Sequence, residues 1–520
     1  MAVVTEDFTE FPAPEAEDAA PPTSAPEADD GPLGWDGYGA ARQRARERTG
    51  ERESVISGTA RIDGVPTVLI SFEFGFLGGS LGERTGDRLV AAYTRARELR
   101  LPVVSLIATG GSRMQEGMRA LTQLQRVAAQ SALTRAAGLP QIAVVRDPTT
   151  GGGWATLGAG ADVVLALPGA QIGFAGSRVR PADADPYAYS AEGQLAAGQI
   201  DAIVPPDRLR TTLGRWLGLL GVGAGAVGPG AVGPRAVGPG VVGPGAVGPG
   251  ATGRPAVPGP AASGPGEPVP AESLPAEPLP AESLPASSEP AASGPAGTAP
   301  SPPPPPHALG SSDLPASGWA AVCAARDERR PRAAAYLDAY FDWREEISGD
   351  RCGGTDTGIR CGFGRRDGRT TAFAAQCGTA VRPAGFRTAA RLIRLADRLG
   401  IPVLTLVDTP GAANDPDAER AGAGAAIADV FATLASVRTP VTSLLIGEGG
   451  SGGALALAAP GALWATPDSY FSVIAPESAA AILKRDANAV RGTADQLRLR
   501  PTDLLDLGII QGIVPPAPSE

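Results

Sequence analysis

Residues 101–111 read LPVVSLIATGG and residues 401–412 read IPVLTLVDTPGA, so one motif occurs twice, 300 positions apart. A short run that is apolar on both faces is typical of a strand buried in a parallel sheet. The glycines that follow the run predict a tight turn at the end of that strand. Two copies of one fold are the simplest interpretation, each with a buried strand that leads into a glycine turn.

A second pair of apolar runs repeats at the same offset. One begins at Pro140 and ends in residues 150–153, TGGG; the other begins at Pro440 and ends in residues 449–453, GGSGG. Around these runs, strand-like and helix-like patterns alternate, which predicts an α/β fold with mainly parallel strands covered by helices. In the first half we expect strands at 68–70, 103–107 and 142–145 and helices at 87–98 and 115–137. In the second half we expect a helix at 334–347, strands around 362–375, a helix at 387–399 and a strand at 403–407.

The composition excludes several classes of protein. The 520-residue chain has a net charge of −10, which argues against binding of a nucleic-acid backbone. No apolar run reaches the roughly 18 residues of a membrane-spanning helix, and the N-terminus lacks a basic segment followed by an apolar core. We therefore expect a cytoplasmic protein that binds neither nucleic acid nor membrane.

Two residue types are almost missing from the chain. The single histidine is His307, inside a proline run, and the single lysine is Lys484. A phosphate-binding loop that needs lysine is therefore excluded, and a catalytic triad that needs histidine is not expected. The cysteines form no Cys-x-x-Cys pair and predict reduced thiols, with a zinc site as the weaker alternative. They are Cys323, Cys352, Cys361 and Cys377.

Composition divides the chain into four segments. Residues 1–45 are rich in Ala, Pro, Asp and Glu and predict a disordered acidic tail, for which a docking role is the alternative. Residues 46–220 form the first α/β domain, and residues 318–516 form the second. Residues 221–317 carry Pro/Gly/Ala-rich repeats that cannot bury enough apolar area to fold, so we expect a disordered linker. A role of these repeats in self-association is the alternative interpretation.

Glycine turns after buried strands indicate one kind of chemistry. Such a turn leaves backbone N–H groups free and lets a ligand approach closely. Two donors directed at one oxygen form an oxyanion hole, in which each donor typically contributes about 3 to 4 kcal/mol of transition-state stabilisation. A single Gly-Gly pair more often serves helix packing. Four turns in matched order in two repeats favour the catalytic interpretation.

Longer motifs around these turns resemble a known enzyme family. The first half is similar to the β subunit of bacterial acetyl-CoA carboxylase carboxyltransferase, and the second half is similar to the α subunit. The motifs in the first half are LGGSLG at 77–82, GGSRMQEG at 110–117, DPTTGG at 147–152 and IGFAG at 172–176. The motifs in the second half are DTPGA at 408–412, IGEGGSGGAL at 446–455 and YFSVIAPE at 470–477.

The resemblance implies a fold and a set of site residues. It implies two crotonase-like (ClpP/crotonase) domains, with an active site where a β-type domain faces an α-type domain. By similarity, the thioester oxygen of the acyl-CoA would be held by Gly110 and Gly111. The ureido oxygen of biotin would be held by Gly411 and Ala412. Helix N-termini that line the site, where the helix dipole favours anions, would carry Gly151, Gly152, Gly452 and Gly453.

The resemblance also implies a reaction and its partners. CO₂ would pass from carboxybiotin on a carrier to acetyl-CoA, giving malonyl-CoA for fatty acid biosynthesis. If the biotin ureido anion itself removes the acyl proton, the scarcity of histidine is no obstacle. Residues 483–486, LKRD, do not resemble a biotin attachment site, so we expect a separate biotin carboxyl carrier protein and a biotin carboxylase. The family's pairing of two domain types leads us to expect a homodimer.

Departures from the family pattern keep other interpretations open. The β subunit usually opens with a four-cysteine zinc finger, whereas residues 1–50 contain no cysteine, so we expect no zinc. The segment after Cys377 and the segment 178–198 are shorter than in the family. Alternatives are therefore a carboxyltransferase or decarboxylase for another acyl-CoA such as propionyl-CoA, or an inactive scaffold subunit. The sequence does not separate acetyl-CoA from propionyl-CoA, because one methylene is worth only about 1 to 3 kcal/mol.

Overall fold

Strands and helices alternate along residues 3–14, 30–221 and 301–517, which are the residues that the structure, a computed structural model, describes. The first half contains β1 (Asp7–Glu10), α2 (Tyr38–Thr49), β2 (Val55–Ile62), β3 (Val65–Phe72), η1 (Leu77–Gly79), α3 (Glu83–Leu99), β4 (Val103–Thr109), η2 (Met114–Glu116), α4 (Gly117–Ala136), β5 (Gln141–Thr150), α5 (Gly151–Gly153), η3 (Trp154–Gly158), β6 (Val163–Ala166), β7 (Ile172–Gly173), η4 (Pro186–Tyr189), α6 (Ala191–Ala196), β8 (Ala202–Ile203), η5 (Pro206–Arg208) and α7 (Leu209–Leu220).

The second half follows a similar order. It contains α8 (Gly318–Arg326), α9 (Ala333–Tyr340), β9 (Trp343–Ile347), β10 (Ile359–Arg366), β11 (Arg369–Gln376), α10 (Pro383–Leu399), β12 (Val403–Thr409), α11 (Pro416–Arg420), α12 (Ala423–Ser436), β13 (Val441–Gly450), α13 (Ser451–Leu455), β14 (Leu463–Ala465), β15 (Tyr470–Ser472), α14 (Pro476–Ile482), η7 (Ala487–Ala489), α15 (Val490–Gln496), α16 (Pro501–Asp506) and β16 (Gly512–Ile513).

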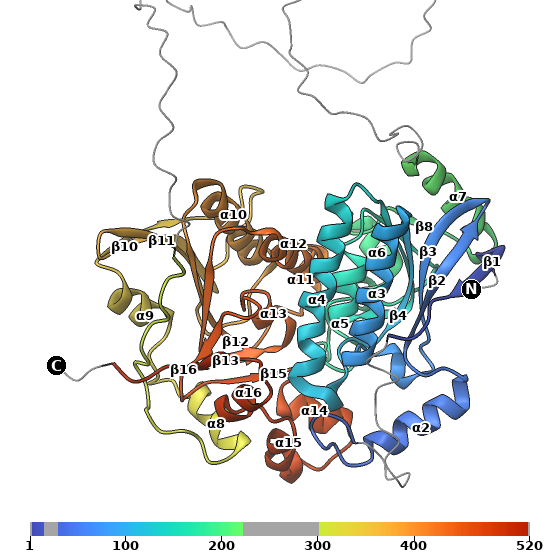
Figure 1. Cartoon of the computed structure of the whole chain (residues 1–520). Helices are drawn as coiled ribbons and strands as arrows, with labels where there is room; N and C mark the ends of the chain where they lie inside the picture. The colour runs from blue at the N-terminus through green and yellow to red at the C-terminus, as the bar shows by residue number, and fades with distance from the viewer. Residues whose placement is uncertain (1–2, 15–29, 222–300, 518–520) are drawn as a thin grey trace, which may run out of the picture. The chain divides into compact units, whose positions relative to one another are not determined.

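Each half is built on one eight-stranded sheet (Figure 1). In the first sheet the strand order is β1-β2-β3-β4-β5-β6-β8, with β7 beside β5. In the second the order is β16-β14-β13-β12-β11-β10-β9, with β15 beside β13. Val103 lies opposite Gln141, and Val403 lies opposite Val441, so the parallel central strands share one register at an offset of 300. The repeated motifs therefore form equivalent strands, and the predicted α/β class with two copies of one fold is confirmed.

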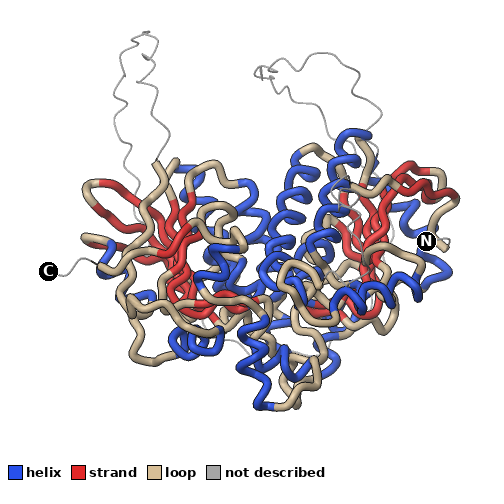
Figure 2. The backbone as a smooth tube through the Cα atoms, turned by 60° about the horizontal axis from the view of Figure 1, so that its bottom comes forward, coloured by secondary structure: helices blue, strands red, loops and turns tan. Residues whose placement is uncertain are grey.

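The central strands and helices agree with the expectations from the sequence, but the helix expected at 334–347 does not. The expected helix at 334–347 is wrong in its second part, because α9 ends at Tyr340 and Trp343–Ile347 forms the edge strand β9. This segment pairs antiparallel with β10, and that backbone pairing outweighs local helix preference. In Figure 2 the long helices lie between the two sheets. No helix within the described segments is long and apolar enough to cross a bilayer.

Two predicted boundaries are wrong. Within the expected acidic tail, β1 extends the first sheet, and both Trp35 and Tyr38 are buried. Within the expected linker, Ala308 is buried, and the Thr442 hydroxyl donates to the Pro303 carbonyl over 2.7 Å. Aromatic and proline groups in these ends pack onto the domains despite a composition that suggests disorder. Residues 1–2 and 15–29 of the predicted tail and residues 222–300 of the predicted linker lie outside the described residues.

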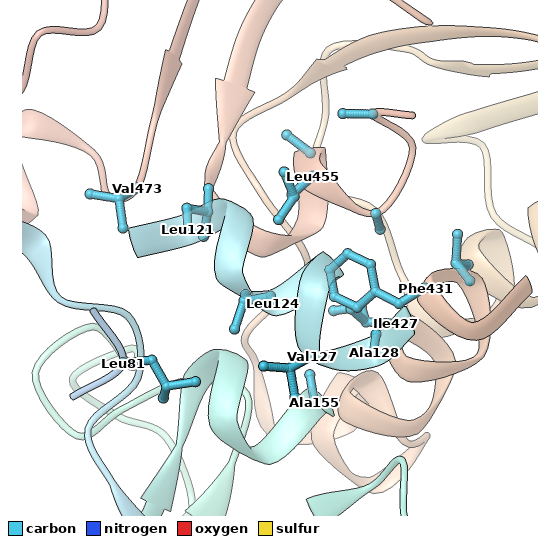
Figure 3. Packing of buried hydrophobic residues seen from close by; sticks show 14 of the residues in the cluster. Leu81, Leu121, Leu124, Val127, Ala128, Ala155, Ile427, Phe431, Leu455 and Val473 are labelled. Carbon is cyan, nitrogen blue, oxygen red and sulfur yellow. The ribbon is translucent and has the colours of Figure 1, made fainter. Parts of the chain in front are cut away.

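The two halves share one hydrophobic core where α4 meets α12 (Figure 3). From the first half, Leu124 and Val127 of α4 contribute buried side chains, and from the second half Ile427 and Phe431 of α12 do so. The Gln125 amide also donates to the Leu455 carbonyl over 3.1 Å. Because α4 follows the first glycine turn and α12 follows the matching turn, this packing brings the two repeated motifs toward each other.

Candidate active site

The first turn of each half follows a central strand and has a glycine at positive φ. Gly111 has φ +101° and Gly411 has φ +139°, values that residues with a side chain rarely adopt. The Gly111 amide donates to the Thr109 hydroxyl over 3.1 Å, and the Gly411 amide donates to the Thr409 hydroxyl over the same distance. The two turns are therefore structurally equivalent, residue by residue, at an offset of 300.

The residue after each of these glycines offers a free donor. Ser112 bridges Leu81, and Ala412 bridges Val381 in the same parallel geometry. In the described part of the chain, neither the Ser112 amide nor the Ala412 amide has an acceptor. Ser112 is thus the structural counterpart of Ala412.

This register changes one residue of the site predicted from sequence. The Gly110 amide already donates to the Gly78 carbonyl over 2.9 Å, so it is occupied. The pair equivalent to Gly411 and Ala412 is Gly111 and Ser112. Ser112 is not among the residues predicted from the sequence, and the offset of 300 along the motif marks it as the counterpart of Ala412.

The second turn of each half begins a short helix, at Gly151 and at Ser451. No side chain caps either helix start, so the first N–H groups lack intrahelical acceptors. These helix starts carry the predicted residues Gly151, Gly152, Gly452 and Gly453.

Within each half the two turns lie against each other. A Cβ placed on Gly111 would lie 3.8 Å from the Gly152 nitrogen. A Cβ placed on Gly453 would lie only 2.3 Å from the Ala412 nitrogen, closer than any real side chain allows. The structure therefore brings together the residues that the sequence placed on separate motifs, and it requires bare backbone at their contact.

Two apolar side chains, Leu124 and Phe174, lie at the helix starts of the two halves. A Cβ on Gly152 would lie 2.5 Å from Leu124 Cδ1, and a Cβ on Gly452 would lie 3.9 Å from the same atom. The Cβ on Gly452 would also lie 3.3 Å from Cζ of Phe174, a residue of the first half. The two helix starts thus face each other across an apolar contact.

Buried ion pairs lie next to the first turn of each half. Arg113 lies 2.8 Å from Glu53 and 3.1 Å from Glu116, and all three side chains are nearly inaccessible. In the second half, Arg330 Nη2 donates to both carboxylate oxygens of Asp408, at 2.9 and 2.8 Å. Asp408 immediately precedes Thr409, so this pair fixes the end of β12 where the turn begins. Such pairs hold geometry, because removing one partner leaves an uncompensated buried charge.

The chemistry available at this site comes mainly from the main chain. Free N–H groups at the two turns of each half suit an acceptor oxygen with developing negative charge, such as a thioester or ureido oxygen. The bare glycines at the turn contacts leave no side chain between such a group and the donors. The residues present therefore fit both an acyl thioester and the ureido ring of biotin.

Comparison with known proteins agrees with this geometry. Residues 36–203 match the family model described as carboxyl transferase domain, and residues 315–519 match the model described as acetyl co-enzyme A carboxylase carboxyltransferase-like. A Salinispora arenicola protein named acetyl-coenzyme A carboxylase carboxyl transferase subunits beta/alpha is 37% identical over 519 residues, covering 96% of this chain and 80% of its own length. The chain belongs to the acetyl-CoA carboxylase carboxyltransferase family. The predicted biotin-dependent carboxyltransferase built on two α/β domains is thereby confirmed.

Among other relatives of this carboxyltransferase, some are named for acetyl-coenzyme A and some for acyl-coenzyme A. A Saccharopolyspora erythraea protein with the same beta/alpha name is 34% identical over 491 residues, covering 91% of this chain and 73% of its own. A Mycobacterium bovis protein named probable biotin-dependent acyl-coenzyme A carboxylase beta3 subunit is 31% identical over 494 residues, covering 93% and 84%. The family thus includes relatives that are named for acyl-CoA in general.

Proposed function

We propose that this carboxyltransferase moves a carboxyl group from carboxybiotin, carried by a separate protein, to acetyl-CoA and so forms malonyl-CoA. The observation that supports this most directly is the pair of equivalent turns whose Ser112 and Ala412 amides have no acceptor among the described residues. One reaction partner would bind at each turn. When bound, carboxybiotin supplies the carboxyl group.

The first half would hold the acyl thioester. Ser112 provides the free amide, Gly111 sets the backbone direction, and the helix start at Gly151 and Gly152 faces them. As the acyl carbon loses its proton, negative charge grows on the thioester oxygen, and these amides stabilise it without having to reorient. Gly110 serves a different role in this proposal, because its bond to the Gly78 carbonyl fixes the turn.

The second half would hold the ureido oxygen of biotin. Ala412 provides the free amide, Gly411 sets the backbone direction, and the helix start at Gly452 and Gly453 faces them. Leu124 and Phe174 close the apolar contact between the two turns. Excluding water there strengthens each hydrogen bond and protects the group in transfer from hydrolysis.

The proposed reaction requires a protein that carries biotin and an enzyme that carboxylates it. Lys484 lies in a sequence unlike a biotin attachment site, so the biotin would arrive on a biotin carboxyl carrier protein. A biotin carboxylase would recharge that carrier. A homodimer of this chain and the absence of zinc remain predictions, to be checked by light scattering and by elemental analysis of the purified protein.

Transfer of label tests the function directly. Purified protein is incubated with labelled carboxylated carrier and with acetyl-CoA or propionyl-CoA in separate reactions, and label in the acyl-CoA is followed. We expect transfer to acetyl-CoA. Preference for propionyl-CoA would favour the second candidate, which the relative named for acyl-coenzyme A keeps in consideration. Transfer to neither compound would overturn both assignments, and transfer to no acyl-CoA in a wider set would favour the scaffold interpretation.

A further inference from the structure

The glycine turns belong to separate halves, so transfer requires that the halves hold one relative position. The segment that follows Ala412 contacts the first half directly. Within that segment, Glu419 on α11 is 1% exposed and lies against the turn that follows β7.

The Glu419 carboxylate binds two backbone amides of the other half. Oε2 accepts from the Phe174 amide over 3.0 Å, and Oε1 accepts from the Ala175 amide over 2.9 Å. None of the ion pairs among the described residues includes Glu419. Both oxygens of a buried carboxylate are thus committed to main-chain donors from 244 and 245 residues away.

The turn held by this carboxylate reaches the candidate site. Phe174 is the residue whose ring lies nearest to Gly452, where a Cβ would come within 3.3 Å of Cζ. On the other side, Gly176 faces Thr150, since a Cβ there would lie 3.5 Å from the Thr150 hydroxyl. Thr150 directly precedes the helix start at Gly151, so this turn contacts the helix starts of both halves.

Neighbouring contacts join the same two segments. The Tyr189 hydroxyl donates to the Asn414 carbonyl over 2.7 Å, and the Asn414 amide group donates to the Val179 carbonyl over 2.8 Å. At the rim, Arg420 pairs with Asp185. The shortened segment 178–198 therefore connects the halves, and it meets the other half only two residues after Ala412.

From these contacts we propose that Glu419 is a positioning residue for carboxyl transfer, which fixes the turn at 173–176 and thereby the distance between the two glycine sites. The inference rests on the proposed function for its catalytic consequence. The charged carboxylate binds both amides strongly, because hydrogen bonds to an ionised acceptor are about twice as strong as neutral ones. A neutral acid or an amide in its place satisfies only one of the two donors well.

The surroundings of Glu419 predict that its ionisation, and with it the positioning of the turn at 173–176, depends on pH. The ionisable groups that face it are Arg180 and Tyr189 from the first half and Asp415 from its own segment, with Asp417, Arg420 and Asp185 nearer the surface. Burial raises the pKa of Glu419 to about 7, against the lowering effect of the two amides and of Arg180. The charged form, and with it the positioning, is therefore lost as the pH falls below neutrality.

Three variants of the full chain test this inference. Glu419→Gln removes the charge and one acceptor. Asp417→Asn removes a charge from the same helix at a side chain that is 83% exposed, and serves as the matched control. Tyr189→Phe removes a neighbouring contact between the halves and leaves the carboxylate in place. Each is measured by hydrogen exchange of the 173–176 amides and by kcat and KM for acetyl-CoA between pH 6 and 8.

In Glu419→Gln we expect faster hydrogen exchange at 173–176. We expect kcat to be about tenfold lower, with KM little changed. The parent's kcat should rise with pH, and this rise should be absent in the variant. Asp417→Asn should match the parent. If Glu419→Gln fails to fold, Tyr189→Phe should show a smaller fall in kcat with the pH dependence retained. Parent-like exchange and an unchanged pH profile in Glu419→Gln would overturn the proposal. A parent that transfers to no acyl-CoA would instead overturn the proposed function, and hydrogen exchange would then decide the inference about Glu419 alone.

Discussion

The peptide nitrogen of Ala412 lies against Gly453 so closely that a methyl group on Gly453 would come within 2.3 Å of it. The contact joins the first and second turns of the second half. Because the atoms nearest to this methyl group are backbone atoms of Gly411 and Ala412, no side-chain rotation relieves the clash. The position of the free Ala412 amide therefore depends on the absence of a side chain at Gly453, the third residue of α13.

Gly453→Ala should consequently lower transfer sharply. We expect kcat to fall by about 10²- to 10³-fold, the effect of losing one oxyanion donor, because the turn must move to admit the methyl group. The control is Gly492→Ala in α15, where a Cβ meets nothing within 4 Å and alanine suits the helix better. Equal activity of both variants would remove Ala412 from the proposed site.

Variants at Ser112 test the corrected register of the first half. Ser112→Ala keeps the amide and should retain near-normal transfer, whereas Ser112→Pro deletes the N–H and should lower kcat by about 10²-fold or more. Gly110→Ala has space around its Cβ and keeps the bond to Gly78, so it should be tolerated. Circular dichroism and the unfolding temperature show whether each variant is folded. A strong loss of kcat in Gly110→Ala together with activity in Ser112→Pro would restore the original assignment.

Stability should depend on pH through Glu419, with a sign opposite to that of activity. Burial raises its pKa from an ordinary value near 4.5 to about 7, so between these values the folded protein binds more protons than the unfolded chain. Its contribution to stability is therefore complete below pH 4.5 and is lost as the pH rises through 7, by about 3 kcal/mol in total. The free energy of unfolding of the parent relative to Glu419→Gln, measured in urea from pH 5 to 8, should fall with pH. A difference that rises with pH would contradict the burial of this carboxyl group.

The Arg330–Asp408 pair should be important for the fold of the second half. Asp408→Ala leaves the Arg330 guanidinium buried and uncompensated, since its side chain is only 2% exposed. We expect the free energy of unfolding to fall by about 3 to 5 kcal/mol. As a control, Asp327→Ala removes an exposed pair with Arg329 and should change stability by less than about 1 kcal/mol. A small effect of Asp408→Ala would mean that the guanidinium finds other acceptors.

The sequence predicted the strands and turns well because they are local and repeated. Residues 103–107 and 403–407 are apolar except for Ser105 and Thr405, and the register of their strands follows from the offset between the motifs. The sequence could not rank Gly110 against its neighbours, because two adjacent glycines look alike in a sequence. Only the bond from Gly110 to the Gly78 carbonyl distinguishes an occupied amide from a free one.

Other features depend on partners that are distant in the chain. The bond between Glu419 and the Ala175 amide spans 244 residues, and no spacing rule connects them. The burial of Trp35 and Tyr38 likewise depends on tertiary packing, which overrides the acidic composition around them. Composition describes the average of a segment, whereas burial is decided by a few side chains.

Equivalent positions in the two halves carry serine at 112 and alanine at 412, yet both present the same atom, a peptide N–H. A group supplied by the main chain survives substitution of the side chain that bears it. The two copies could therefore diverge toward different reaction partners by changing the side chains around the turns while the groups that stabilise charge stayed in place. After duplication of such a unit, each copy keeps its peptide N–H donors while the side chains around them change.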